Sequence, residues 1–405
     1  MDQAIKNRIE QIKKRQVPVE YENTFLGVFP IDWEKKTLSS VSVNNGTYGI
    51  NAAACNYCEY LPKYIRITDI DNNGNYIDNN AYVNDINSKD YILKTNDIVF
   101  ARTGASVGKN YLYKEKDGEL VYAGFLIKYS IDSEKCNPYI VYANCNSKAY
   151  WNWVKIVCSR SGQPGINAEE YSSYKFQVAN SKEEQKRIAK ILMKWDEAVE
   201  LQESYITKLE IRKKALMQKL LTVKEEWKDV KFSNAITFFK YKIELQRKNY
   251  QEKGIYPIID QGKNSIAGYT NIYEALNICP SKGLLLFGDH TTEFKFIKNN
   301  FVVGGDGVKL FKTKEPYNLN FIYYSLLLNP IIIEGYKRHY GILRNKTLFF
   351  PIKNGVVDSN EQKYISDILS ISDEEISLQQ QKLKKLMLQR KSLQQLLLTG
   401  IVRVI

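Results

Sequence analysis

The feature that most constrains this chain is a long internal repeat. Segments 184–222 and 361–399 align without a gap, at a constant offset of 177 residues (361 − 184). Identical residues recur along the alignment, from the Glu-Gln pairs at its start to the Leu-Leu-Thr triplets at its end. Self-similarity at one fixed spacing marks a duplicated structural unit. We therefore expect two copies of one element within the 405 residues.

Both repeat segments predict long helices. Neither contains Pro or Gly, and both are rich in Leu, Lys, Glu and Gln, which favour helix. Each segment would span roughly 58 Å as a helix, which is longer than the helices of compact domains usually are. Apolar residues recur in both at alternating spacings of four and three, the heptad pattern of a coiled coil.

The heptad seams of the two segments are interrupted at matching places, Gln202 with Gln379 and Lys213 with Arg390. Polar seam residues weaken a coiled coil but fix its register and partner. We therefore expect the two helices to pack on each other as an antiparallel pair. The alternative, that each helix packs only on its own domain, stays open. The predicted seam includes Leu192, Trp195, Val199, Gln202, Leu209, Leu369, Ile376, Gln379 and Leu386.

A different block precedes each helix. Both blocks are rich in β-branched and aromatic residues broken by Asn, Gly and Asp, which predicts short strands and turns. The overall prediction is a mixed α/β fold, with two related domains in pseudo-twofold arrangement joined by two long antiparallel helices. The expected boundaries are an N-terminal basic helix or arm (1–20), a first domain (21–181), a central helix (182–222), a second domain (223–359), a C-terminal helix (360–400) and a tail (401–405).

Charge points to a polyanionic partner. The chain has 58 Lys and Arg against 45 Asp and Glu, a formal net charge of +13. A basic balance of this kind favours nucleic acid, although a merely solvated basic surface remains an alternative. No apolar run reaches the ~18 residues of a membrane-spanning helix. The N-terminus also lacks the apolar core of a secretory signal. We therefore expect a cytoplasmic protein with no membrane partner.

Motifs for catalysis or metal binding are weak. Cys55 and Cys58 form a C-x-x-C pair without a second pair or paired His at ligand spacing, so reduced structural thiols are the preferred interpretation and no metal is expected. The stretch from Gly104 to Lys109 departs from the phosphate-binding P-loop, because it has three residues between its glycines and Asn110 after the Lys. We expect no catalytic residues.

Several phrases resemble those of the specificity subunits of type I restriction-modification systems, and they follow that family's order along nearly the whole chain. The second half departs from the first, with Gly288-Asp289-His290 where the first has Arg102-Thr103-Gly104. The phrases are GVFPIDW (27–33), RTGASVGK (102–109), GQPGIN (162–167), EEQKRIA (183–189), ALMQKLLT (215–222) and LLTGIVRV (397–404).

This resemblance implies a division of labour. The two blocks would be target-recognition domains, each reading half of a bipartite, asymmetric site on double-stranded DNA. The helices would set the gap between the half-sites and dock two modification (methyltransferase) subunits, which use S-adenosylmethionine to methylate adenine at N6. ATP-dependent restriction subunits would join for cleavage. No cofactor is expected in this chain, because S-adenosylmethionine, ATP and Mg²⁺ belong to the partner subunits.

Candidates for DNA contact follow from side-chain chemistry. Arg can bond guanine bidentately, and Asn or Gln can bond adenine, while many such groups contact only phosphate. Lys109 is expected to reach a phosphate. The predicted contacts are Arg102, Ser106, Lys109, Arg160, Ser161 and Gln163 in the first domain, and His290, Arg338, His339, Tyr340 and Arg344 in the second.

Two rival classes of function remain at this stage. A coiled-coil DNA-binding adaptor without sequence preference would share the helices and the basic charge, and a DNA competition assay would separate it from a sequence reader. A fused nuclease or methyltransferase would need the cofactor or metal motifs described above as weak or missing. For the two histidines, His290 and His339, the default expectation is a solvent-exposed position in a loop.

Overall fold

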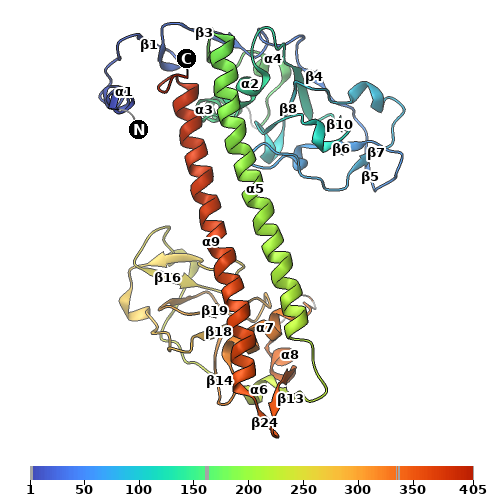
Figure 1. The fold of residues 1–405 in the computed structure, drawn as a ribbon, viewed down its shortest axis with the longest axis vertical. Coiled ribbons are helices and arrows are strands. Elements are labelled where there is room, and N and C mark those ends of the chain that lie inside the picture. The colour runs from blue at the N-terminus through green and yellow to red at the C-terminus, as the bar shows by residue number, and fades with distance from the viewer. Residues whose placement is uncertain (1–2, 160–163, 334, 336–337, 405) are drawn as a thin grey trace. The chain divides into compact units, whose positions relative to one another are not determined.

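The computed structural model describes residues 3–159, 164–333, 335 and 338–404. It divides into a first unit, residues 1–201 and 384–405, and a second unit, residues 202–383. Both repeat segments are single helices, α5 (Lys182–Leu220) and α9 (Ser359–Leu398), 39 and 40 residues long (Figure 1). Each long helix therefore contributes one end to each unit. The two long helices and the mixed α/β composition confirm the expected fold class.

The first unit is built on two four-stranded sheets. One is antiparallel with the order β4-β11-β8-β9, and the other is mixed with the order β10-β6-β7-β5. Their strands are β4 (Thr47–Tyr48), β5 (Ala54–Cys55), β6 (Lys63–Ile65), β7 (Tyr82–Val83), β8 (Asp97–Ala101), β9 (Asn110–Leu112), β10 (Leu120–Tyr122) and β11 (Leu126–Ser130). The remaining elements are α1 (Gln3–Lys13), β1 (Tyr21–Thr24), β2 (Gly27–Pro30), β3 (Trp33–Thr37), α2 (Pro138–Asn144), α3 (Lys148–Cys158), α4 (Ala168–Ser172) and β12 (Lys175–Ala179).

The central strand β8 explains how these layers are held together. All five of its residues are buried. Ile98 and Phe100 belong to the core shared with the helices, whereas Val99 and Ala101 belong to the core between the two sheets. Successive side chains of a strand point to opposite faces. A continuous apolar run is therefore required at this position, because the strand has no face toward water.

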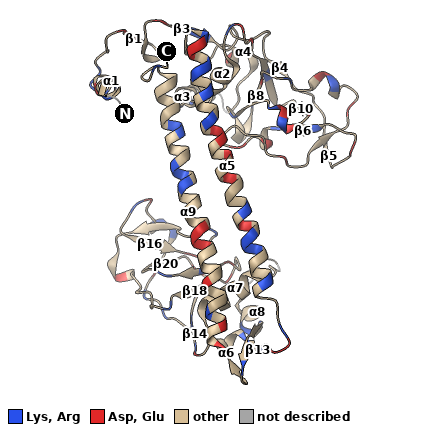
Figure 2. Cartoon of the chain, in the orientation of Figure 1, with Lys and Arg blue, Asp and Glu red and all other residues tan. Residues whose placement is uncertain are grey.

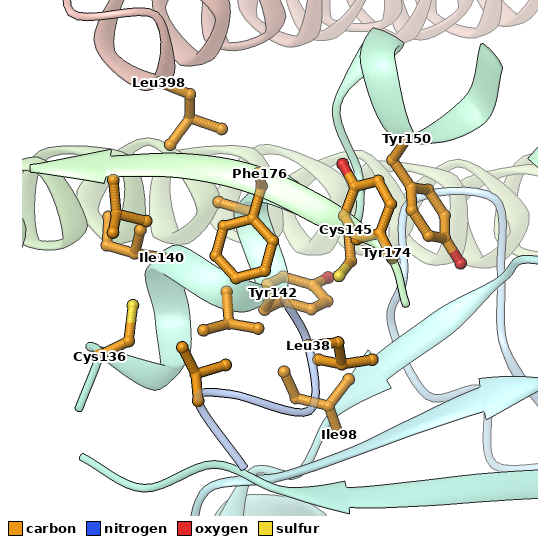
Figure 3. Packing of buried hydrophobic residues seen from close by; sticks show 14 of the residues in the cluster. Leu38, Ile98, Cys136, Ile140, Tyr142, Cys145, Tyr150, Tyr174, Phe176 and Leu398 are labelled. Carbon is orange, nitrogen blue, oxygen red and sulfur yellow. The ribbon is translucent and has the colours of Figure 1, made fainter. Parts of the chain in front are cut away.

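Both long helices enter the core of the first unit. Ile188 and Leu192 near the start of α5, and Leu397 and Leu398 at the end of α9, belong to the same buried cluster as the sheet and α2. Figure 3 shows Leu398 of α9 above Phe176 of β12, with Ile140 of α2 nearby. Burying apolar area of this kind is the main favourable term in folding.

The second unit repeats this layout. Its antiparallel sheet has the order β14-β21-β18-β19, and its mixed sheet has the order β15-β20-β16-β17. The strands are β14 (Ile236–Phe238), β15 (Glu244–Leu245), β16 (Tyr256–Ile259), β17 (Gly268–Thr270), β18 (Leu284–Gly288), β19 (Phe294–Ile297), β20 (Val302–Gly304) and β21 (Val308–Thr313). The other elements are β13 (Lys228–Lys231), α6 (Phe232–Ala235), α7 (Leu319–Leu328), α8 (Tyr340–Asn345), β22 (Thr347–Phe350), β23 (Ile352–Lys353) and β24 (Val356–Val357).

The second core follows the same rule as the first. Leu285 and Phe287 of β18 face the helices, and Leu284 and Leu286 face the second sheet. The ends of the long helices that enter this core are the reverse of those that enter the first core. The core contains Ile365 and Leu369 from the start of α9, Met217 from the last turn of α5, and Leu221, which directly follows α5. Each domain therefore buries the beginning of one long helix and the end of the other.

The long helices also contact each other directly. In the second unit, Gln202 donates from Nε2 to Oε1 of Gln379 at 3.0 Å, and Lys213 pairs with Asp373 at 2.5 Å. Residue numbers rise on α5 as they fall on α9, so the helices are antiparallel there. The helices therefore pack on each other as well as on the domains, and the alternative that each helix packs only on its own domain is wrong.

Charge supports the antiparallel pairing in the second unit. The first half of α9 is predominantly acidic and its second half is basic (Figure 2). The acidic half lies in the second unit with the part of α5 that carries Lys208, Arg212 and Lys213. Opposite charges flanking an apolar seam select helix orientation and register.

The C-terminal tail belongs to the first unit through a set of polar contacts. Arg403 forms ion pairs with Asp32 at 2.7 Å and with Glu184 at 2.6 Å. The Tyr21 hydroxyl donates to the Gly400 carbonyl at 2.6 Å. Hydrogen bonds that the Arg403 guanidinium donates to the Glu184 carboxylate help raise the pKa of Arg403 above its ordinary value despite partial burial. The tail thus holds the start of α5 and the β2–β3 corner together.

Candidate nucleic-acid interfaces

Arg102 directly follows β8 and is fixed through its backbone and its side chain. Its N–H donates to the Phe125 carbonyl at 3.1 Å, and its own carbonyl accepts the Ile166 N–H at 2.9 Å. Its guanidinium lies 4.8 Å from the ring centroid of Tyr48 on β4, a cation–π contact. The Tyr48 hydroxyl accepts the Ala168 N–H at 3.3 Å. These contacts position the guanidinium while leaving its hydrogen-bonding edge without an ion-pair partner among the described residues.

The surroundings of Arg102 suit contact with a base. Phe125, 58% exposed, occupies the turn between β10 and β11. A cleft of about 350 Å³ beside Arg102 is lined also by Thr103, Asn167 and Glu170. Asn167 and Glu170 hydrogen-bond each other's backbone N–H groups as a capping box at the start of α4, so part of their capacity is already used.

The loop that follows Arg102 contains Ser106 and Lys109, both half-buried. The Lys109 ammonium donates to the Ile70 carbonyl at 3.1 Å. An ammonium has three donors, so two remain for a phosphate. A side chain on Gly108 would lie within 3.0 Å of Val154 and Trp151, which explains the glycine. Arg160, Ser161 and Gln163 lie outside the described residues.

The second domain builds the same backbone framework from different residues. Asp289 follows β18 as Arg102 follows β8. Its N–H donates to the Gly307 carbonyl at 2.8 Å, and its carbonyl accepts the His339 N–H at 2.9 Å. Asp289 is thus the structural counterpart of Arg102, and Gly307 that of Phe125. Unlike Arg102, Asp289 is 2% exposed and accepts the Tyr340 N–H at 2.7 Å.

His339 is buried, and this corrects the expectation of a solvent-exposed loop histidine. Its side chain has no exposed surface, and its Nδ1 lies 3.1 Å from the Asp289 carbonyl oxygen. The backbone pairing of His339 with Asp289 draws the ring into the domain. His290 is half-buried, and its N–H donates to Oε1 of Gln261 at 3.1 Å.

Gln261 holds the loops of the second domain together and was missed from the sequence. Its Nε2 donates to the Asp306 carbonyl at 2.8 Å, and its carbonyl accepts the Thr291 hydroxyl at 2.6 Å. Together with the His290 contact, these bonds join three loops that are distant in sequence. The only available signal was the polar Asp-Gln-Gly run directly after the apolar strand β16.

The remaining candidates of the second domain surround α8. Arg338 is exposed, with its guanidinium 3.9 Å from the Asp306 carboxylate. Tyr340 stacks on Phe311 at an interplanar angle of 17°, and burial raises the pKa of its hydroxyl. Phe238, which the sequence analysis did not select, is exposed with its ring centroid 5.4 Å from that of Tyr340. Arg344 is exposed on the last turn of α8.

Lys295 shows that part of this surface is internally braced. Its ammonium donates to the carbonyls of Asp260 and Asn264, at 2.7 and 2.5 Å. Burial lowers its pKa, against the opposing effect of nearby carboxylates. The lysine therefore orders the loop that carries Gln261.

The cysteines and the acidic side chains of the described residues form neither disulfides nor a metal site. All six cysteines are free thiols, and Cys55 Sγ donates to the Tyr82 carbonyl. Within the described ranges, no group of three or more His, Cys, Asp or Glu side chains is arranged to hold a metal ion. Of the described helices, none has the length and apolar character needed to span a bilayer.

Comparison with known proteins gives a consistent picture. Residues 30–211 match the type I restriction modification DNA specificity domain. A protein assigned as the specificity subunit of the type I restriction enzyme MjaX of Methanocaldococcus jannaschii is 26% identical over 424 residues, covering 95% of this chain and 97% of the relative.

Two solved structures have a similar fold. The S subunit of the type I restriction-modification system from M. genitalium superposes with a TM-score of 0.59 at 14% identity, covering 91% of this chain and 96% of that chain. A further chain, from a structure of a type I restriction-modification system, gives a TM-score of 0.51 at 12% identity, covering 92% and 99%.

Proposed function

We propose that this chain is a type I restriction-modification specificity subunit and that its two domains each read one half of a bipartite, asymmetric DNA site. The observation that carries the proposal is one backbone framework bearing unlike side chains, Arg102 and Phe125 in the first domain against Asp289 and Gly307 in the second. Equivalent loops with different donors and acceptors suit two different half-sites, because bases are distinguished by hydrogen-bonding pattern.

Phosphate contacts would supply the affinity. Exposed or half-buried cations lie next to the candidate base-reading groups in both domains, Lys109 in the first and Arg338 and Arg344 in the second. Such contacts fix the protein on the duplex without reading sequence. The net charge of +13 favours the same partner.

The test is the methylation pattern of cells that carry the gene and its partner subunits, compared with cells in which the gene is interrupted. We expect methylated adenines in one split motif that disappears with the gene. Its two specific halves should be about one helical turn apart, centre to centre. If interrupting the gene removed methylation from no split motif, the proposal would be contradicted. Equal binding of all duplexes in a competition assay would instead indicate an adaptor without sequence preference.

We further propose that two modification subunits dock on the long helices. Large apolar side chains are exposed at repeat-equivalent positions, Leu201 with Leu378 and Ile211 with Leu388. Exposed apolar groups of this size mark protein–protein contacts when they recur in a pattern. Two equivalent sets on one chain suit two copies of one partner. Restriction subunits, driven by ATP, would join this complex for cleavage.

In this proposal the chain contributes recognition, and methyl transfer and cleavage belong to its partners. S-adenosylmethionine, ATP and Mg²⁺ would accordingly bind the modification and restriction subunits. Titration of S-adenosylmethionine into the isolated chain in a calorimeter tests this division. We expect no binding heat, and saturable binding would show a cofactor site in this chain.

A further inference from the structure

One carboxylate in the first unit joins both long helices and the domain. Asp196 of α5 accepts from Nε of Arg390 on α9 at 2.7 Å and from Nη2 of the same guanidinium at 3.3 Å. It also accepts the hydroxyl of Tyr139, which lies on α2 of the first domain. We call these three residues the Asp196 cluster. Although burial alone would lower the pKa of Arg390, its hydrogen bonds to Asp196 raise it.

The second unit contains a corresponding group. Asp373 of α9 pairs with Lys213 of α5 at 2.5 Å and accepts the hydroxyl of Tyr324, on α7 of the second domain, at 2.7 Å. We call these residues the Asp373 cluster. Its carboxylate and cation lie 177 residues from those of the Asp196 cluster, with the helices exchanged (373 − 196 and 390 − 213). Such reciprocal contacts are expected of two equivalent halves.

The tyrosines of the two clusters come from non-equivalent positions of their domains, so duplication of the sequence does not by itself account for them. Both α2 and α7 begin at an Asn cap, Asn137 and Asn318. The N–H of each cap donates to a repeat-equivalent glutamine, Gln185 or Gln362, at 2.9 Å. Measured from these caps, Tyr139 lies in the first helical turn and Tyr324 about one turn later. Different positions in the two domains therefore supply a hydroxyl to the same position of the helix pair.

We propose that Asp196 and Asp373 are positioning residues that fix the orientation of each recognition domain on the helix pair, so that the gap and the reading of each half-site depend on them. This inference rests on the proposed function. Each carboxylate fixes the register of the helices through a cation, and the domain through a tyrosine. Both carboxylates are half-buried, and a shared acceptor couples its partners, because loss of one leaves the others without full compensation.

The two clusters differ in strength. In the first, Gln394 of α9 also donates to the Ala143 carbonyl of α2 at 2.6 Å, and it is buried. Its repeat counterpart in the second unit is the apolar Met217. The cation of the first cluster is an Arg with two bonds to the carboxylate, whereas the second has a Lys with one. We therefore expect the first domain to be held more firmly.

Tyr139→Phe and Tyr324→Phe are the most selective test, because each leaves the ion pair between the helices in place. Tyr142→Phe is the matched control, since its hydroxyl lies on α2 but donates to the Asn73 and Gly74 carbonyls of the same domain. We expect Tyr139→Phe to admit motifs with a gap altered by one base pair and to lower methylation about tenfold. Tyr142→Phe should keep the wild-type gap.

Asp196→Asn and Asp373→Asn give the stronger variants. Arg390→Lys is the conservative variant and should keep the ion pair, because a lysine, Lys213, is the cation of the Asp373 cluster. Amide exchange of the full chain without DNA provides a readout independent of function. In Asp196→Asn the amides of α2 should exchange about tenfold faster, while those of α7 stay unchanged. Asp373→Asn should show the reverse.

Unchanged gaps and unchanged α2 and α7 exchange in the Tyr and Asp variants would overturn the inference. So would faster exchange throughout the chain, which would show a general structural role. Failure of the proposed function is distinguished by the wild type, which would then show no split motif. The exchange measurement would still decide whether the clusters hold the domains.

Discussion

Arg102 is the residue with the clearest expected role in base recognition. Cation–π contact with Tyr48 holds its guanidinium at the edge of the cleft. A planar fork of this kind matches the O6 and N7 acceptors of guanine. Asp289, its counterpart in the second domain, instead accepts the N–H of Tyr340, the first residue of α8. The two domains therefore place different side chains, with different contacts, at one position of the framework.

We predict that Arg102→Ala relaxes the specificity of one base pair in one half-site, at a cost of about 1–3 kcal/mol in discrimination, and that Arg102→Lys does not restore it. Methylated motifs are the readout. Lys109→Ala is the comparison variant. It should weaken binding to all duplexes and reduce the slope of log affinity against log salt by about one. An unchanged motif in Arg102→Ala would exclude a base contact.

Asp69 illustrates a polar group that serves stability. It is 1% exposed and accepts from the backbone and guanidinium of Arg66 and from Asn79. Burial alone would raise the pKa of this carboxyl, but the hydrogen bonds outweigh burial and lower it. Its contribution to stability is thus fully present above about pH 4 and is lost as pH falls through the lowered pKa.

We predict that Asp69→Asn destabilises the chain by about 2 kcal/mol near pH 7. The difference from wild type should shrink as pH falls below about 4, where the wild-type carboxyl becomes protonated. Urea unfolding at several pH values measures this. A difference that stayed constant down to pH 3 would show that the ionised carboxylate is unimportant.

At the scale of elements, the long helices are the features that the sequence predicts best. Their apolar spacing and freedom from Pro and Gly predicted helices over 184–222 and 361–399, and the structure has Lys182–Leu220 and Ser359–Leu398. Short strands in both blocks were also predicted, but not their individual bounds. The sheet order was not, because pairing partners such as β11 and β8 are chosen by contacts between distant segments.

We predict that removing one heptad from both helices, residues 203–209 together with the repeat-equivalent 380–386, shortens the recognised gap by about three base pairs. Seven residues of helix span about 10 Å, and DNA rises 3.4 Å per base pair. The seam stays in register on both sides. Removing the heptad from only one of the two helices is the control, and it should abolish activity. Full activity with an unchanged gap would show that the helices do not set it.

For the whole molecule, the duplicated exposed leucines lead to a prediction about stoichiometry. Leu201→Glu and Leu378→Glu should each remove one of two modification subunits, because a carboxylate would be buried unpaired at one of two equivalent contacts. Native mass measurement of the co-purified complex reads this directly, with Lys214→Gln as the exposed control on the same helix. Retention of both partners in the double variant would exclude this surface.

The sequence by itself determined the duplication, the two long helices and the strand-rich character of the two blocks, because periodicity and propensity are properties of neighbouring residues. It also selected Arg102 and the α8 region as candidate contacts. Tertiary structure alone decided that His339 is buried, that Asp289 is the counterpart of Arg102, and that Gln261 joins three loops. Those relations depend on hydrogen bonds between residues far apart in the chain, which no local pattern encodes.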